Sequence, residues 1–128
     1  MKQQVLCSFF ITMKKLKEIV MEERKMLEGT FAVLDRHLMV KMPRELDHHN
    51  AGRIRERADH FLLMDNVDHI VFDFEDTVFM DSSGIGVIMG RYKKVSCFGG
   101  KVYAIHTNER IKKIMRMSGL QNIVEIMS

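Results

Sequence analysis

Beyond Gly29, short apolar runs alternate with helical hydrophobic periods, a pattern typical of a mixed α/β layer fold. Two apolar runs, 31–34 and 38–42, flank the segment Asp35-Arg36-His37 and predict a β-hairpin. Pro43 follows the second run and cannot donate a hydrogen bond to a ladder, so we expect the hairpin to end there.

Helices and strands are predicted to alternate after the hairpin. Apolar residues recur at spacings of three and four in 51–62 and again in 85–95, which predicts two amphipathic helices. The run 70–74 between them is almost entirely apolar and predicts a central strand covered on both faces. The remaining predicted elements are a strand at 101–105, a helix capped by Asn108 and closed by Gly119, and a final strand at 123–127.

The first 29 residues have a different pattern and form a predicted N-terminal extension, 1–29, ahead of a single domain, 30–128. Apolar positions in 13–27 follow a helical period and predict an amphipathic helix. Two interpretations stay open: a non-essential stretch before a true start at Met21 or Met26, or an arm for a partner or for self-association.

Composition and charge exclude several classes of protein. The chain is 46% hydrophobic and 29% charged, close to an average soluble domain. Its net charge of +3 conceals an acidic middle, because 31–90 carries six Lys and Arg against eleven Asp and Glu. The basic stretch 91–128 contains only three aromatic residues, which argues against direct DNA binding.

Cysteine content and the first apolar run indicate the compartment. Cys7 and Cys97 are too few for a disulfide framework, and no C-x-x-C pair is present, so we expect a reducing cytoplasm. The apolar run 5–13 is about half as long as a membrane span and lacks a cleavage pattern. We therefore expect neither export nor membrane insertion.

The most informative residues lie between the central strand and the second helix, in the sequence FMDSSGIG at 79–86. Asp81, Ser82 and Ser83 are all residue types that cap helices, so the first N–H groups of this helix should point at the turn. A phosphate on a serine there would meet those donors and add about −1.5 to −2 of charge beside Asp81. The pattern fits either a plain N-cap or a phosphorylation switch.

Glycines mark one side of the same predicted helix. Gly84, Gly86 and Gly90 leave that side with little side chain, although glycine lowers helix stability by up to about 1 kcal/mol per position. Close approach of another backbone would explain them; plain packing inside the domain is the alternative.

Three segments resemble those of STAS-domain anti-sigma factor antagonists, in particular the sporulation type that releases the forespore sigma factor. ELDHH at 45–49 resembles the family's loop before the first helix, and FMDSSGIGVIMGRYK at 79–93 resembles its signature. MSGL at 117–120 resembles the segment before its last strand. The resemblance covers about residues 30–127 and implies a mixed β-sheet with helices packed on it, hairpin first.

The resemblance implies an interaction switch that is not an enzyme and needs no cofactor. In that family an anti-sigma factor that is also a serine kinase phosphorylates the first serine after the aspartate, here Ser82, with Ser83 as second choice. The unphosphorylated protein binds the anti-sigma factor and releases the sigma factor; the phosphorylated protein lets go, and a serine phosphatase resets it. The partner-binding residues implied are Glu45, Asp47, His48, Asp81, Ser83, Gly84, Ile85 and Gly86.

The family also has a C-terminal helix after its last strand, and we expect this helix to be missing here. We expect the helix predicted at 13–27 to cover the apolar sheet surface left exposed. A STAS module of another pathway, such as stress signalling, is the nearest alternative function.

Other constellations fit the sequence less well. His48-His49 would suggest a metal, but adjacent side chains point apart and no spaced ligand follows, so we predict no metal site. A hydrolase would pair Ser82 or Ser83 with His106, yet the G-x-S-x-G pattern is absent. A response-regulator site would use Asp73, Glu75 and Asp76 with Lys101, but these carboxylates follow a single strand, and no phosphate-binding P-loop motif is present.

Overall fold

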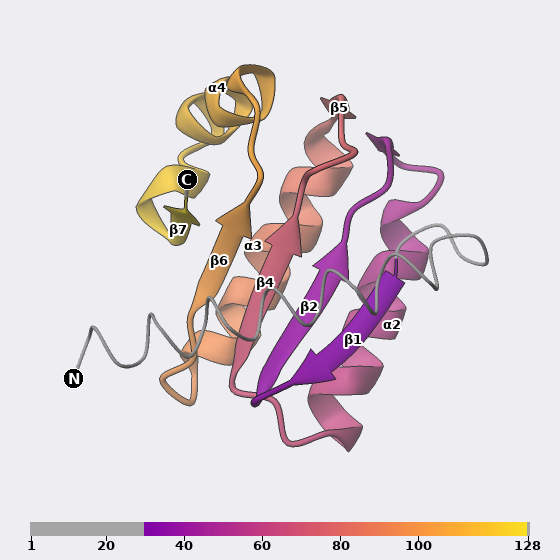
Figure 1. Ribbon diagram of the computed structural model, residues 1–128, viewed down its shortest axis with the longest axis vertical. Helices are drawn as coiled ribbons and strands as arrows, with labels where there is room; N and C mark the ends of the chain where they lie inside the picture. The colour runs from indigo at the N-terminus through magenta and orange to yellow at the C-terminus, as the bar shows by residue number, and fades with distance from the viewer. Residues whose placement is uncertain (1–29, 128) are drawn as a thin grey trace.

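The computed structural model describes residues 30–127, which fold into a five-stranded sheet with helices on one side (Figure 1). The helix expected at 13–27 lies outside the described residues. The strands of the main sheet are β1 (Thr30–Leu34), β2 (His37–Lys41), β4 (His69–Asp73), β6 (Val102–Ile105) and β7 (Val124–Met127). The other elements are β3 (Glu45–Leu46), β5 (Phe79–Met80), α2 (Ala51–Met64), α3 (Ser82–Ser96), α4 (Glu109–Ser118) and the 3-10 turn η1 (Leu120–Asn122).

The sheet has the order β1-β2-β4-β6-β7, with β1 antiparallel to β2 and the other neighbours parallel. Each parallel connection passes through a helix and advances one strand in the same direction. Because such crossovers are right-handed, the helices collect on one face of the sheet. Figure 1 shows α2 and α3 behind the strands. The predicted mixed α/β fold with an opening hairpin is confirmed.

The hairpin turn is tighter than the sequence suggested. Asp35 and Arg36 both have positive φ, 53° and 63°, as a two-residue type I′ turn requires, and His37 already belongs to β2. The Arg36 guanidinium pairs with the Asp68 carboxylate at the start of the next strand. This ion pair links the hairpin turn to the loop that precedes β4.

Alternation along the strands divides the sheet into two faces. Leu38 and Val40 of β2 and Ile70 and Phe72 of β4 point to the helices and join the main core. Val71 of β4 points to the opposite face and is also completely buried. The prediction of a central strand covered on both faces is therefore confirmed.

The helix ends follow the predicted capping residues. The Asn108 Oδ1 atom accepts a hydrogen bond from the Ile111 N–H at 2.9 Å, which caps α4. Gly119 ends α4 in the left-handed conformation with φ 81°, which a residue without Cβ adopts at little cost. Both ends of α4 lie where the sequence predicted them.

Candidate functional site

A two-stranded sheet that the sequence analysis missed organises the site. β3 pairs in parallel with β5, with Glu45 opposite Phe79 and Leu46 opposite Met80. The Asp81 N–H then donates to the Leu46 carbonyl at 3.1 Å. These short strands bring the loop 45–49 beside the first turn of α3, although more than 30 residues separate them in the chain. Two-residue strands carry no periodicity, so the pattern of apolar residues could not reveal them.

Asp81 is the N-cap of α3. Its Oδ1 atom accepts hydrogen bonds from the Ser83 N–H at 2.8 Å and the Gly84 N–H at 3.4 Å. Ser82 is the first helical residue and is exposed, whereas Ser83 is only half exposed. The Ser82 hydroxyl therefore lies at the positive end of the helix dipole, within reach of an approaching protein.

The loop 45–49 is held by its own backbone and by Asn50. The Asn50 Oδ1 atom accepts from the Asp47 N–H at 3.0 Å, and its Nδ2 donates to the Glu45 carbonyl at 2.6 Å. The Asp47 carboxylate accepts the His49 N–H at 2.9 Å, and this bond lowers the Asp47 pKa below its usual value. Asp47 thus carries a negative charge near α3 at neutral pH.

His48 and Asp81 connect the loop to the cap. The His48 Nδ1 atom lies 3.9 Å from the Asp81 Oδ2 atom, and the His48 side chain is largely exposed. Glu45 is exposed as well, beside the exposed ring of Phe79. The acidic residues implied by the family resemblance are therefore gathered around the start of α3.

A shallow groove of about 380 Å³ runs between the first turns of α2 and α3. Ser83 and Gly86 of α3 and Gly52 and Arg55 of α2 line it, together with His48, Ala51 and Val87. A Cβ atom on Gly86 would meet nothing within 4 Å, so the glycine keeps the groove open. The sequence analysis did not single out Gly52 or Arg55; the spacing of Arg55 from Ala51, one helical turn, is the signal that could have found it.

Of the two interpretations left open for the glycines of α3, packing inside the domain holds for Gly84. A Cβ atom on Gly84 would lie 2.6 Å from Met80 Cγ and 2.7 Å from Leu46 Cγ, which are buried side chains of β5 and β3. Gly90, like Gly86, has open space around its Cβ position. Because Gly84 has no side chain, α3 can pack closely on the two-stranded sheet of β3 and β5. Ile85 is half buried and packs against the main core.

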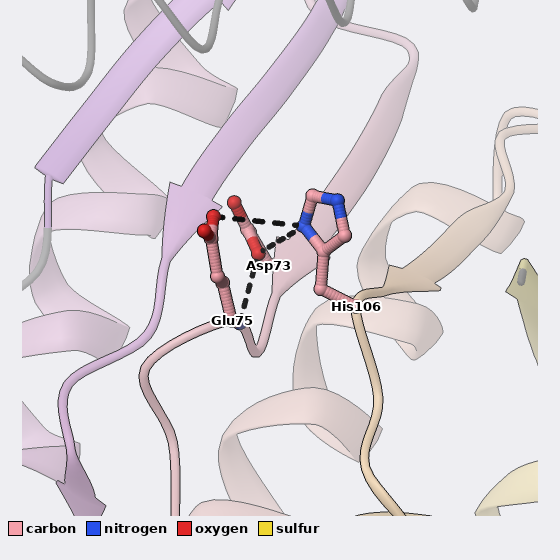
Figure 2. Close-up of side chains that lie close together, drawn as sticks. All are labelled: Asp73, Glu75 and His106. Atoms are coloured by element: carbon pink, nitrogen blue, oxygen red, sulfur yellow. Dashed lines mark hydrogen bonds and ion pairs between the residues drawn. The ribbon is translucent and has the colours of Figure 1, made fainter.

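A second polar cluster lies at the carboxyl ends of β4 and β6 (Figure 2). The His106 Nδ1 atom lies 2.9 Å from Asp73 Oδ1 and 3.9 Å from Glu75 Oε2. These three side chains offer ligand atoms within 4.8 Å of one another, so they could hold a metal ion. The buried Lys41 ammonium, however, lies 3.1 Å from Glu75 Oε2 and 3.8 Å from Asp73 Oδ2. A lysine of the chain already supplies positive charge to these carboxylates.

The arrangement argues against the hydrolase alternative, in which His106 would act as the base for Ser82 or Ser83. Within residues 30–127, the hydrogen bonds of His106 lead to Asp73, and none joins it to Ser82 or Ser83. The response-regulator alternative expected Lys101 beside the same carboxylates. The Lys101 ammonium instead pairs with Glu125 of β7, and Lys41 is the lysine at the cluster.

Comparisons with known proteins agree on one family. The family model described as the STAS domain matches residues 30–128. The anti-sigma F factor antagonist of Paenibacillus polymyxa is 38% identical over 89 residues, which cover 70% of this chain and 76% of the relative.

Solved structures resemble the fold over most of both chains. The anti-sigma factor antagonist SpoIIAA in its unphosphorylated form superposes with a TM-score of 0.71 at 26% identity, covering 78% of this chain and 88% of the other. The Bacillus cell fate determinant SpoIIAA in the phosphorylated form gives 0.64 at 26% identity, covering 78% and 91%. None of the helices described in residues 30–127 has the length and apolar character to cross a bilayer.

Proposed function

Because this chain belongs to the STAS-domain family, within its group of anti-sigma factor antagonists, we propose that phosphorylation of Ser82 switches its binding to an anti-sigma factor. The unphosphorylated chain binds the anti-sigma factor and frees the sigma factor. The observation that carries the proposal is the exposed Ser82 hydroxyl at the first turn of α3, next to the Asp81 cap.

Ser82 is a better phosphate acceptor than Ser83 for reasons of access. Ser82 is exposed, whereas Ser83 is half buried and lines the groove between α2 and α3. A kinase must bring the γ-phosphate of ATP to the hydroxyl from outside, so the more exposed oxygen is the one it reaches.

The charge around Ser82 explains why phosphorylation would weaken binding. A phosphoserine adds about −1.5 to −2 of charge. The Asp81 carboxylate caps the start of α3, and the Asp47 carboxylate belongs to the loop whose Leu46 carbonyl accepts the Asp81 N–H. A partner that covers this surface would desolvate the added charge beside two others, and each tenfold loss of affinity needs only about 1.4 kcal/mol.

The surface that docks on the partner comprises three neighbouring parts. The loop 45–49 supplies acidic side chains, the exposed Phe79 supplies apolar area, and the groove beside Gly86 accepts a protruding side chain. A basic patch on the anti-sigma factor suits the acidic loop.

The proposed cycle needs two further partners. The anti-sigma factor acts as the serine kinase, and a serine phosphatase restores the hydroxyl; the exchange takes place in the cytoplasm. A relative that was solved in both unphosphorylated and phosphorylated forms supports a reversible modification in this family. The chain itself is a substrate of these enzymes, consistent with the regulatory character of the family.

Phosphorylation is tested by incubating the full chain with ATP and the anti-sigma factor of the same organism, followed by mass spectrometry. We expect one phosphate on the chain and on Ser83→Ala, and none on Ser82→Ala. Phosphate on neither serine would remove the proposed switch.

Binding is tested by titrating the anti-sigma factor, loaded with nucleotide, with the same variants. We expect Ser82→Ala to bind like the parent and Ser82→Asp to bind at least about tenfold more weakly. Ser96→Asp is the matched control, because Ser96 is exposed at the opposite end of the same helix and should bind normally. Equal affinity of Ser82→Asp and Ser96→Asp would contradict the proposal.

A further inference from the structure

The face of the main sheet opposite the helices carries a second apolar cluster. Met39 of β2, Val71 of β4 and Ile105 of β6 form its centre. Side chains of the outer strands and of β6 pack against them: Ala32, Leu34, Tyr103 and Met127. The cluster therefore crosses all five strands, from β1 to β7.

The centre of this cluster consists of side chains that are almost fully buried. Met39 is 2%, Val71 0% and Ile105 5% exposed. The helices among the described residues, α2, α3 and α4, contribute to the core on the other face. An apolar stripe on a sheet face is stable only when another element packs against it. Residues 30–127 supply no helix there.

Polar side chains limit the cluster at both ends of β2 and β4. His37 and His69 lie two residues before Met39 and Val71, and Lys41 and Asp73 lie two residues after them. Two residues of strand correspond to about 7 Å, so the apolar band is about 10–14 Å wide. A helix with its side chains is about 10–12 Å across. The band has about the width of one helix. It runs diagonally across the strands, because Leu34 of β1 lies opposite His37, whereas Ile105 of β6 lies opposite Asp73. Met127 of β7 lies opposite Ile105.

We propose that residues 13–27 of this chain cover the band as an amphipathic helix. Their apolar positions, Met13, Leu16, Ile19, Val20 and Leu27, follow a helical period. Fifteen residues of helix are about 22 Å long, and five strands span about 19 Å between the outer two. The helix therefore matches the sheet in length as well as in width.

The point of attachment agrees with this placement. Residue 27 is followed by two residues before β1, which is the edge strand, and Thr30 pairs with Lys41 at the polar end of the band. The C-terminal end of the proposed helix can therefore lie at the β1 edge of the sheet, with the helix extending across the strands toward β7. It would lie on the face away from α2 and α3, so the groove beside Ser83 stays open to a partner.

The contact is tested in the full chain with a nitroxide label on Lys17→Cys, in a background of Cys7→Ser and Cys97→Ser. Signals of the methionine methyl groups report the distance to the label. Met39 and Met127 lie on the proposed face, while Met115 is buried on the other side of the sheet and serves as the control. We expect at least about tenfold greater broadening for Met39 than for Met115, because the two layers are about 10 Å apart. Equal broadening of Met39 and Met115 overturns the proposal.

Two further samples identify what covers the band. Replacing Leu16 and Ile19 by Gln should abolish the broadening of Met39, whereas replacing Lys14 and Lys15 by Gln should preserve it. If the Leu16 and Ile19 variant still broadens Met39, the apolar contact is refuted. Broadening that passes from labelled to unlabelled chains in a mixture would show that a second copy covers the face, and would also refute the proposal. Should the Gln variant fail to fold, the parent comparison of Met39 with Met115 still decides.

Discussion

Alanine at two glycines of the same helix should change stability in opposite directions. At Gly84 a new Cβ would lie 2.6 Å from Met80 Cγ and 2.7 Å from Leu46 Cγ, against an ordinary carbon contact of about 3.5–4.0 Å. Both neighbours are buried and the contacted atoms are not chain ends, so relief requires the two-stranded sheet to shift. Overpacking of this kind costs about 1–3 kcal/mol, which outweighs the gain of up to about 1 kcal/mol from replacing a helical glycine.

At Gly86 only the gain applies. No atom lies within 4 Å of its Cβ position, so Gly86→Ala should stabilise the protein by up to about 1 kcal/mol. Urea unfolding of both variants, followed by circular dichroism, measures the difference; about 1 kcal/mol corresponds to roughly 4–8 °C in Tm for a domain of this size. The reasoning is refuted if Gly84→Ala is as stable as Gly86→Ala.

The same two variants distinguish an effect on folding stability from an effect on partner binding. The Gly86 methyl group would enter the groove beside Ser83, so Gly86→Ala should weaken anti-sigma factor binding about tenfold while raising stability. Unchanged binding by this more stable variant would remove the groove from the partner surface and leave the stability argument intact.

Three other substitutions test single features. Asp81→Ala should lower the free energy of unfolding by about 1 kcal/mol in urea, because it removes the side-chain cap of α3. Lys41→Met should lower the free energy of unfolding by up to about 3–5 kcal/mol, because it removes the ammonium 3.8 Å from the buried Asp73 carboxylate and leaves His106 and the Glu75 N–H as its partners; a smaller effect than in Asp81→Ala would contradict this. Burial lowers the His69 pKa below 6.5, so the folded state binds fewer protons there than the unfolded state. Stability should therefore fall as pH drops from about 7.5 to 5.5, and less steeply in His69→Gln; identical slopes would rule out His69 as a contributor.

Long, periodic elements could be predicted from the sequence. The hairpin, the alternation of strands and helices and the caps Asp81, Asn108 and Gly119 follow from local patterns and local capping chemistry. The sequence predicted a hairpin turn one residue longer than the observed one. Asp35 and Arg36 both adopt positive φ, and no glycine in the turn indicates this conformation in the sequence.

Contacts between distant segments could not be predicted in this way. The pairing of β3 with β5 depends on backbone groups of two residues each, and the role of Gly84 depends on Leu46 and Met80, which come from that pairing. Likewise, Lys41 meets Glu75 only because β2 lies next to β4 in the folded sheet. Only the resemblance to a family, and not periodicity, assigned residues of the loop 45–49 and of the serine segment to one partner-binding set.

The pairing of β3 with β5 has a consequence for how such proteins diverge. The link between loop and helix includes main-chain hydrogen bonds, such as that from the Asp81 N–H to the Leu46 carbonyl, and these do not depend on the identity of exposed side chains. Glu45 and Phe79 can therefore be exchanged for other residues while the Ser82 hydroxyl, the proposed phosphate acceptor, keeps its place. Duplicated copies of such a gene could acquire separate targets through surface substitutions alone, each inheriting the same proposed phosphorylation site.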